Sequence, residues 1–243
     1  MFKILSLFAL INLIVQGNCE PLKDDVYQKA YTLLRKLKVD TNLNEYEVTS
    51  KSSGWLASYD EAANRYIVDE ENRLTETYNA ILVVAEELKA EAKAESAEGC
   101  VATLDQDLDT VRNYAGQYQA CVMMVGNAVV RYLAELNNQI YMLSQKILDY
   151  QQRFNACGKD EGCLEELIPV LQNAFAEIPE AILKKIPEAE AYIAESSGFR
   201  LQYCSGCAQL RTETEALFEQ VKECIQTQSN IILYEYEEDD VDF

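Results

Sequence analysis

The cysteines are the residues of this sequence whose type and spacing could do chemistry. Cys204 and Cys207 form a Cys-x-x-Cys pair in "YCSGC", a spacing that occurs in redox centres, zinc sites and disulfide frameworks. Thioredoxin-type chemistry places the first thiol at a helix N-terminus that follows a strand, and no strand-like alternation precedes Cys204. The chain has no histidine, which removes nucleophile–histidine catalysis and histidine-containing zinc sites. Cys157, Cys163, Cys204 and Cys207 together remain as an alternative four-cysteine zinc site.

The amino terminus favours disulfides over thiol chemistry, because it has the pattern of a secretory signal peptide. Lys3 precedes an apolar run over residues 4–15, and small residues follow that run, which is the expected order of charged, apolar and cleavage regions. We expect cleavage after Cys19, with cleavage after Gly17 as the alternative, so residues 1–19 are read as a signal peptide. No later run reaches the roughly 18 to 20 apolar residues of a membrane span. The sequence therefore predicts a soluble, secreted, extracellular protein.

Seven cysteines follow the signal peptide, and in an exported chain such a set predicts a disulfide framework. They are Cys100, Cys121, Cys157, Cys163, Cys204, Cys207 and Cys224. Cys157 and Cys163 flank a turn-forming stretch, which makes a local bridge between them easy.

The other bridges follow from matched separations along two antiparallel helices. Cys100 and Cys121 are 21 residues apart, and Cys204 and Cys224 are 20 apart, so Cys100 fits Cys224 and Cys121 fits Cys204. The helical angle gives a different indication, since Cys207 lies nearer the face of Cys224 than Cys204 does. The partner of Cys121 therefore stays open between Cys204 and Cys207. The odd cysteine is expected to be buried or to join two chains in a disulfide-linked dimer.

Long helices must carry these cysteines, because the 243 residues include only 9 glycines and 4 prolines. Apolar residues at spacings of three and four predict helices near residues 22–38, 58–96, 103–154 and 199–227. Gly116 and Gly126 are the candidate bends of the third helix. The fold class expected is all-α: an elongated, disulfide-stapled bundle of long antiparallel helices.

Two stretches are expected to interrupt the helices. The polar stretch 40–54 predicts a loop, and Trp55 beside it is expected to anchor that loop on the bundle. Pro169, Pro179 and Pro187 predict short helices broken at each proline.

The domain organisation expected has four parts: the signal peptide 1–19, an N-terminal helical region 20–97, a cysteine-containing helical domain 98–228 and a disordered acidic tail 229–243. Tyr234 and Tyr236 lie in "LYEYEEDD" within this tail, a setting typical of tyrosine sulfation in exported proteins.

The segments around the cysteines also carry a resemblance to a known family. They read "YAGQYQACVMMVGNA", "RFNACGKDEGCLEELIPVLQNAF" and "FRLQYCSGCAQLRTETEALFEQVKECI": a Tyr-rich helix ending in Cys, a short-spaced Cys pair, and a Gln-Tyr-Cys segment before a helix that closes on Cys-Ile. Over residues 98–226 this pattern resembles the TsetseEP domain family of secreted dipteran proteins. The resemblance implies an insect, exported, helical domain without an assigned reaction or catalytic residue. The helical region before Cys100 departs from the family's domain, and the acidic tail resembles the Glu-Pro repeats of the family's namesake only loosely.

The charge of the chain limits its partners. There are 41 acidic and 21 basic residues, a net charge of −20, which disfavours nucleic acid and anionic membranes and favours a basic partner. Asp105, Asp107 and Asp109 imitate the start of a calcium-binding EF-hand loop, but Thr110 stands where that loop needs glycine and Gly116 where it needs glutamate. We therefore read the three acids as the first turn of a helix, with no metal or cofactor.

These observations lead us to expect a secreted, non-enzymatic protein. It would act by interaction with an unknown extracellular protein or as a structural component. One alternative is a carrier that holds a small apolar ligand between its helices. Another is a salivary or haemolymph protein that inhibits a basic protein through its acidic tail.

Overall fold

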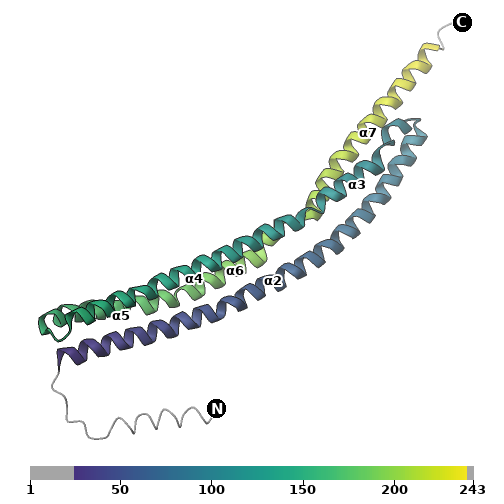
Figure 1. Ribbon diagram of the computed structural model, residues 1–243. Coiled ribbons are helices and arrows are strands. Elements are labelled where there is room, and N and C mark those ends of the chain that lie inside the picture. The colour runs from purple at the N-terminus through teal and green to yellow at the C-terminus, as the bar shows by residue number, and fades with distance from the viewer. Residues whose placement is uncertain (1–24, 240–243) are drawn as a thin grey trace, which may run out of the picture. The chain divides into compact units, whose positions relative to one another are not determined.

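The computed structural model describes residues 25–239 and the side chains of residues 25–229. Within them every element is helical (Figure 1), which confirms the all-α class. The elements are α2 (Val26–Ala94), η1 (Glu98–Val101), α3 (Leu104–Ala115), α4 (Tyr118–Cys157), α5 (Glu161–Leu183), α6 (Lys185–Glu195), η2 (Ser196–Arg200) and α7 (Gly206–Asp239). The signal peptide expected over residues 1–19 lies outside the described residues.

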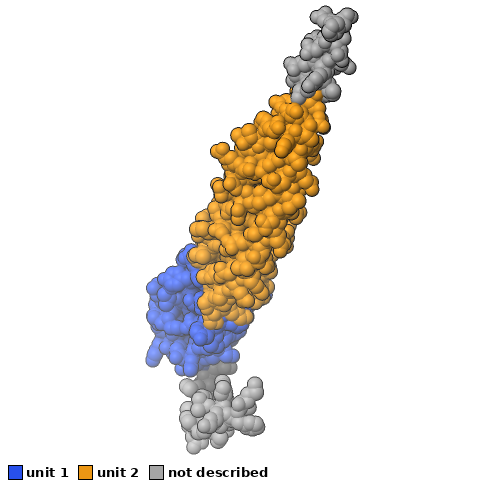
Figure 2. Space-filling view, turned by 90° about the vertical axis from the view of Figure 1, so that its right-hand side faces the viewer, with its two compact units in different colours: residues 1–49, 137–186 blue, residues 50–136, 187–243 orange. Residues whose placement is uncertain are grey.

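The chain forms two compact units, and each unit is assembled from two separate stretches of sequence (Figure 2). The described part of unit 1 consists of residues 25–49 and 137–186, and that of unit 2 consists of residues 50–136 and 187–239. Helices α2 and α4 therefore contribute one part to each unit.

Unit 1 is built from the first part of α2, the last part of α4 and α5. The Ser144 hydroxyl donates to Glu45 Oε2 at 2.6 Å, and the rings of Tyr31 and Phe154 lie 6.2 Å apart. These two pairs show that α2 and α4 are antiparallel here, because the residue number rises along α2 as it falls along α4. The core consists of buried apolar side chains from all three helices: Ala30, Leu34, Leu37, Val48, Ile140, Ile147, Phe154, Leu164, Leu167, Ile168, Leu171, Ala174, Ile178 and Ile182.

The predicted loop over residues 40–54 is wrong, because α2 passes through it without a break. Leu37, Thr41 and Val48 are all fully buried and lie on one helical face. Burial of a large apolar side chain stabilises by about 1.5–3 kcal/mol, whereas Ser, Thr or Asn costs up to about 0.7 kcal/mol of helix propensity. Packing therefore outweighs the composition of this stretch. Trp55 is buried, at 9% exposed, but it lies within α2, so the prediction that it anchors a loop is wrong.

The predicted break at each proline is also wrong. Pro169 and Pro179 lie inside α5, and Pro187 lies in the first turn of α6. An interior proline costs roughly 3 kcal/mol, and the apolar face of α5 offsets this with seven buried residues, most of them worth about 1.5–3 kcal/mol each. The chain breaks instead at Lys184. Pro187 is tolerated because first-turn N–H groups have no partner within the helix.

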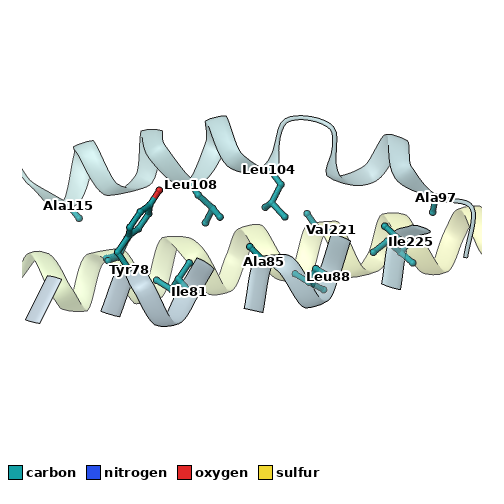
Figure 3. Close-up of a cluster of buried hydrophobic side chains, with 12 residues drawn as sticks. Tyr78, Ile81, Ala85, Leu88, Ala97, Leu104, Leu108, Ala115, Val221 and Ile225 are labelled. Atoms are coloured by element: carbon teal, nitrogen blue, oxygen red, sulfur yellow. The ribbon is translucent and has the colours of Figure 1, made fainter. Parts of the chain in front are cut away.

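Unit 2 packs the second part of α2 against α3, the first part of α4 and α7. The Tyr78 hydroxyl donates to Asp109 Oδ1 at 2.6 Å, and Lys89 Nζ donates to Asp105 Oδ1 at 2.6 Å, so α2 and α3 are antiparallel. Figure 3 shows the buried side chains of α2, α3 and α7 pointing toward one another. Leu104, Leu108 and Ala115 are the α3 members of this cluster.

The two glycine positions have different outcomes. The single helix predicted over residues 103–154 is interrupted at the candidate weak point Gly116, because α3 ends at Ala115 and α4 begins at Tyr118. No break occurs at Gly126, which lies inside α4. A Cβ atom at Gly126 would lie 3.4 Å from the ring of Tyr59, so this glycine provides room for close packing.

The last helix differs from the prediction at both ends. It begins at Gly206 rather than near residue 199, because residues 196–200 form a π-helix and a turn follows. It continues to Asp239, so the backbone of residues 229–239 is helical where we expected a disordered tail. Residues 207–239 contain neither glycine nor proline, and nothing in the local sequence ends the helix earlier. The sulfation candidates Tyr234 and Tyr236 lie beyond the described side chains.

Candidate functional site

The cysteines form three disulfide bonds among the described residues. Cys100 pairs with Cys224, Cys121 pairs with Cys204, and Cys157 pairs with Cys163. The first two bridges lie in unit 2, where they join two antiparallel segments, and the third closes a turn in unit 1. The pairs predicted from matched separations are confirmed, and the open choice for Cys121 is settled as Cys204. The four-cysteine zinc alternative is excluded, because three of its four thiols are consumed in bridges.

Cys207 is the odd cysteine, and its thiol is free and 2% exposed. It lies in the first turn of α7, whereas Cys204 lies in the turn before that helix. The Thr77 hydroxyl is 3.1 Å from Cys207 Sγ. Of the two positions expected for the odd cysteine, the structure shows the buried one.

A buried carboxylate fixes the start of α7. Glu70 is 1% exposed, and its Oε1 atom accepts hydrogen bonds from the Cys207 N–H and the Ser205 hydroxyl, both at 2.8 Å. Ser205 in turn accepts from the Ala208 N–H at 3.1 Å, as a helix N-cap residue does. The negative carboxylate faces the positive end of the helix dipole, which is a stabilising arrangement. This contact places Cys204, two residues before the helix, where Cys121 can reach it.

The second oxygen of Glu70 is less well paired. Glu70 Oε2 lies 3.5 Å from Arg73 Nη1 but has no hydrogen-bond partner among the described residues. The buried Tyr66 hydroxyl also lacks a hydrogen-bond partner among these residues. The pKa of Tyr66 is raised to about 12, chiefly by burial and next by the Glu70 carboxylate, while Arg73 opposes the shift. The phenol therefore stays neutral. Glu70, Tyr66 and Cys207 form a desolvated polar cluster inside unit 2.

Sequence reasoning missed Glu70, because it is one of 41 acidic residues. A signal was present nonetheless. Glu70 falls at helical spacing between Ala63 and Tyr78, which are buried, so an acid interrupts the apolar face of α2. An acid at such a position must be paired, since burial of an isolated charge is costly.

The three acids that imitate an EF-hand lie in α3: Asp105 and Asp107 are in its first turn, as predicted, and Asp109 is in the next turn. Asp105 pairs with Lys89, Asp107 accepts from the Thr103 hydroxyl at 2.8 Å, and Asp109 accepts from Tyr78. Each carboxylate is thus engaged by another side chain. No group of three or more metal-ligating side chains comes together within the described part of the chain.

Unit 1 contains a hollow of about 220 Å³ between α2 and α4. Leu34 and Phe154, which are 7% and 6% exposed, contribute apolar surface to it. Its remaining lining residues are Tyr31, Arg35, Lys38, Gln151 and Asn155. The hollow therefore combines aromatic and aliphatic surface with two cations and two amides.

Comparison with known proteins identified no related protein. No family model, no curated protein and no solved structure matches this chain. The resemblance to the TsetseEP domain family stays a prediction from the cysteine motifs. Among the described helices, none has the length and apolarity needed to cross a membrane.

Proposed function

We propose that this chain is a secreted, non-enzymatic protein that acts through contacts with other extracellular molecules or as a structural component. The observation that carries the proposal is the disulfide framework. Six cysteines are paired in three bridges, and structural disulfides form and persist in oxidising compartments. Two of the bridges hold helical segments in register, which suits a rigid extracellular scaffold.

An exposed patch beside one bridge supports a contact function. Phe199 and Tyr203 meet edge to face at 4.7 Å and are 58% and 74% exposed. Tyr203 adjoins Cys204, and Met124, 66% exposed, follows Cys121 by one helical turn. Tyr, Phe and Met are enriched at protein interfaces. We call Met124, Phe199 and Tyr203 the aromatic–methionine patch.

Expression of the full chain in a secreting eukaryotic cell tests the compartment. We expect the protein in the medium, with its N-terminus at Glu20 and the three bridges intact in peptide mapping by mass spectrometry. Retention inside the cell with reduced cysteines would contradict the proposal.

Photo-crosslinking tests the contact function. A photoactivatable residue at Met124 should give a discrete adduct with a second protein in the extracellular fluid of the source tissue. The adduct should be lost when Phe199→Ser and Tyr203→Ser are combined, and it should persist in Tyr46→Ser, a control whose tyrosine is 73% exposed in unit 1. An adduct that both variants retain, or no adduct at all, argues against this surface.

The acidic segment 229–243 is a second candidate contact, because six of its last nine residues are acids. Its deletion should abolish binding to a basic extracellular protein such as a clotting protease. The circular dichroism spectrum should stay helical and lose only the signal of the deleted turns. The affinity of the intact chain should fall steeply with added salt. Equal binding by the truncated chain would show that this segment is not the binding site and contributes only to the net charge of the protein.

A further inference from the structure

We propose that the hollow between α2 and α4 in unit 1 binds a small amphiphilic anion: an oxyanion such as a carboxylate on a short hydrocarbon chain or a single aromatic ring. This inference goes beyond the contact function proposed above and does not depend on it. It rests on the apolar floor of the hollow, on the two cations at its edge and on its size.

The floor of the hollow is apolar and well supported. Leu34 and Phe154 are almost fully buried, whereas Tyr31 is 45% exposed and forms a wall. Tyr27 packs behind this surface, with its ring 5.2 Å from that of Phe154. A hydrocarbon or aromatic body lying here would be removed from water against preformed apolar surface, as in most small-molecule sites.

Two cations line the hollow, and neither has an ion-pair partner among the described residues. Arg35 and Lys38 lie one helical turn apart and both line the hollow. Among the described residues neither has an acidic side chain within 4.0 Å, although acids outnumber bases 41 to 21 in this chain. Like charges one turn apart repel each other. An oxyanion bound between them would relieve that repulsion, and the arginine fork matches carboxylate geometry.

The size of the hollow limits the ligand. Its volume of about 220 Å³ equals about seven water molecules at roughly 30 Å³ each, enough for an apolar body of about six to eight carbon atoms. Gln151 and Asn155 on the α4 side supply amide donors for further oxygen atoms. A short-chain carboxylate such as octanoate satisfies both requirements.

Isothermal titration calorimetry of the mature full-length protein with octanoate tests the inference. Acetate keeps the carboxylate charge but lacks the hydrocarbon chain. Octan-1-ol keeps the hydrocarbon chain but lacks the charge. We expect octanoate to bind at least about tenfold more tightly than either, because both the floor and the cations contribute. No octanoate binding at millimolar concentration, or equal binding of acetate, overturns the proposal.

Paired variants locate the site. Arg35→Gln with Lys38→Gln should weaken octanoate binding by about tenfold or more. Lys29→Gln with Lys146→Gln, which makes the same change in net charge in unit 1 away from the hollow, should leave it unchanged. Equal losses in the two double variants would show a general charge effect and overturn the proposal.

Two further measurements complete the test. Tyr31→Ser removes an exposed side chain, so folding should be kept while octanoate binding weakens and acetate binding does not. Binding to anionic phospholipid vesicles that depends on Arg35 and Lys38 but is not displaced by octanoate would assign the cations to a lipid surface, and would overturn the assignment to a small ligand.

Discussion

Replacement of Glu70 by glutamine tests whether a buried charge stabilises unit 2. The wild-type carboxylate accepts two hydrogen bonds at 2.8 Å, from the Cys207 N–H and the Ser205 hydroxyl. Hydrogen bonds to a charged group contribute about 1.5–3 kcal/mol each, against about 0.5–1.5 kcal/mol for neutral pairs. Glutamine keeps an acceptor oxygen but loses the charge, so about 1 kcal/mol should be lost per bond and about 2 kcal/mol in all. The ion pair with Arg73 adds little, because Arg73 is 63% exposed.

Urea unfolding of the disulfide-intact protein, followed by circular dichroism, measures this loss. A decrease of about 2 kcal/mol should also lower the melting temperature by roughly 4–8 °C in a chain of this size. Glu71→Gln is the matched control. Glu71 is the next residue, is exposed and accepts one hydrogen bond from Gln119 at 3.0 Å, so its replacement should cost less than about 0.5 kcal/mol.

The reasoning would be refuted if Glu70→Gln were as stable as wild type or more stable. Such a result would mean that the desolvation cost of the carboxylate cancels the gain from its hydrogen bonds, as replacement of some buried charged groups has shown. Glu70→Ala should cost more than glutamine, because it leaves the buried Cys207 N–H without an acceptor.

Further predictions concern Tyr66, the disulfide bridges and Cys207. Tyr66→Phe should be neutral or slightly stabilising at pH 7, because the buried hydroxyl has no partner among the described residues. Burial, followed by the Glu70 carboxylate, raises the pKa of Tyr66 from 10.0 to about 12, so the folded state favours the neutral phenol. The stability that depends on this neutral form is fully present below pH 10 and is lost as the pH rises through 12, so urea midpoints between pH 10 and 12 should fall less steeply in Tyr66→Phe than in wild type. Replacing Cys121 and Cys204 by alanine removes a bridge with a sequence separation of 83 and should cost up to about 4.5 kcal/mol by loop entropy, against about 2.2 kcal/mol for the Cys157–Cys163 bridge with a separation of 6. Equal urea midpoints for the two double variants would contradict this ranking. Thiol titration should detect Cys207 only after denaturation, since it is buried, and rapid labelling of the native protein would show that the start of α7 opens.

The helical class and the bridges could be predicted because they depend on regular spacing. Few glycines and prolines and apolar positions three and four apart indicate helices, and matched separations indicate which cysteines face each other across two antiparallel segments. The loop at 40–54 and the breaks at Pro169 and Pro179 were wrong for a common reason. Each was inferred from local composition, whereas the burial of Leu37, Val48 and the face of α5 depends on neighbours that sequence alone does not place.

The polar cluster and the hollow were beyond sequence reasoning for a different reason. Glu70 and Cys207 are 137 positions apart, and Arg35 and Phe154 come from different helices. Only the packing of α2 against its partners brings these groups together. Periodicity identified the apolar face of α2, but it could not show which polar residue on that face has a partner.

The Cys-x-x-Cys pair illustrates how a helix boundary decides the role of each cysteine. The helical angle favoured Cys207 over Cys204 only if both belonged to the same helix as Cys224. Because α7 begins at Gly206, Cys204 lies in the preceding turn, where the rotation of 100° per residue does not apply, and it reaches Cys121. Cys207 is turned into the interior, with its backbone N–H on Glu70. The glutamate that fixes the start of α7 thereby separates the two cysteines, one into a bridge and one into the core.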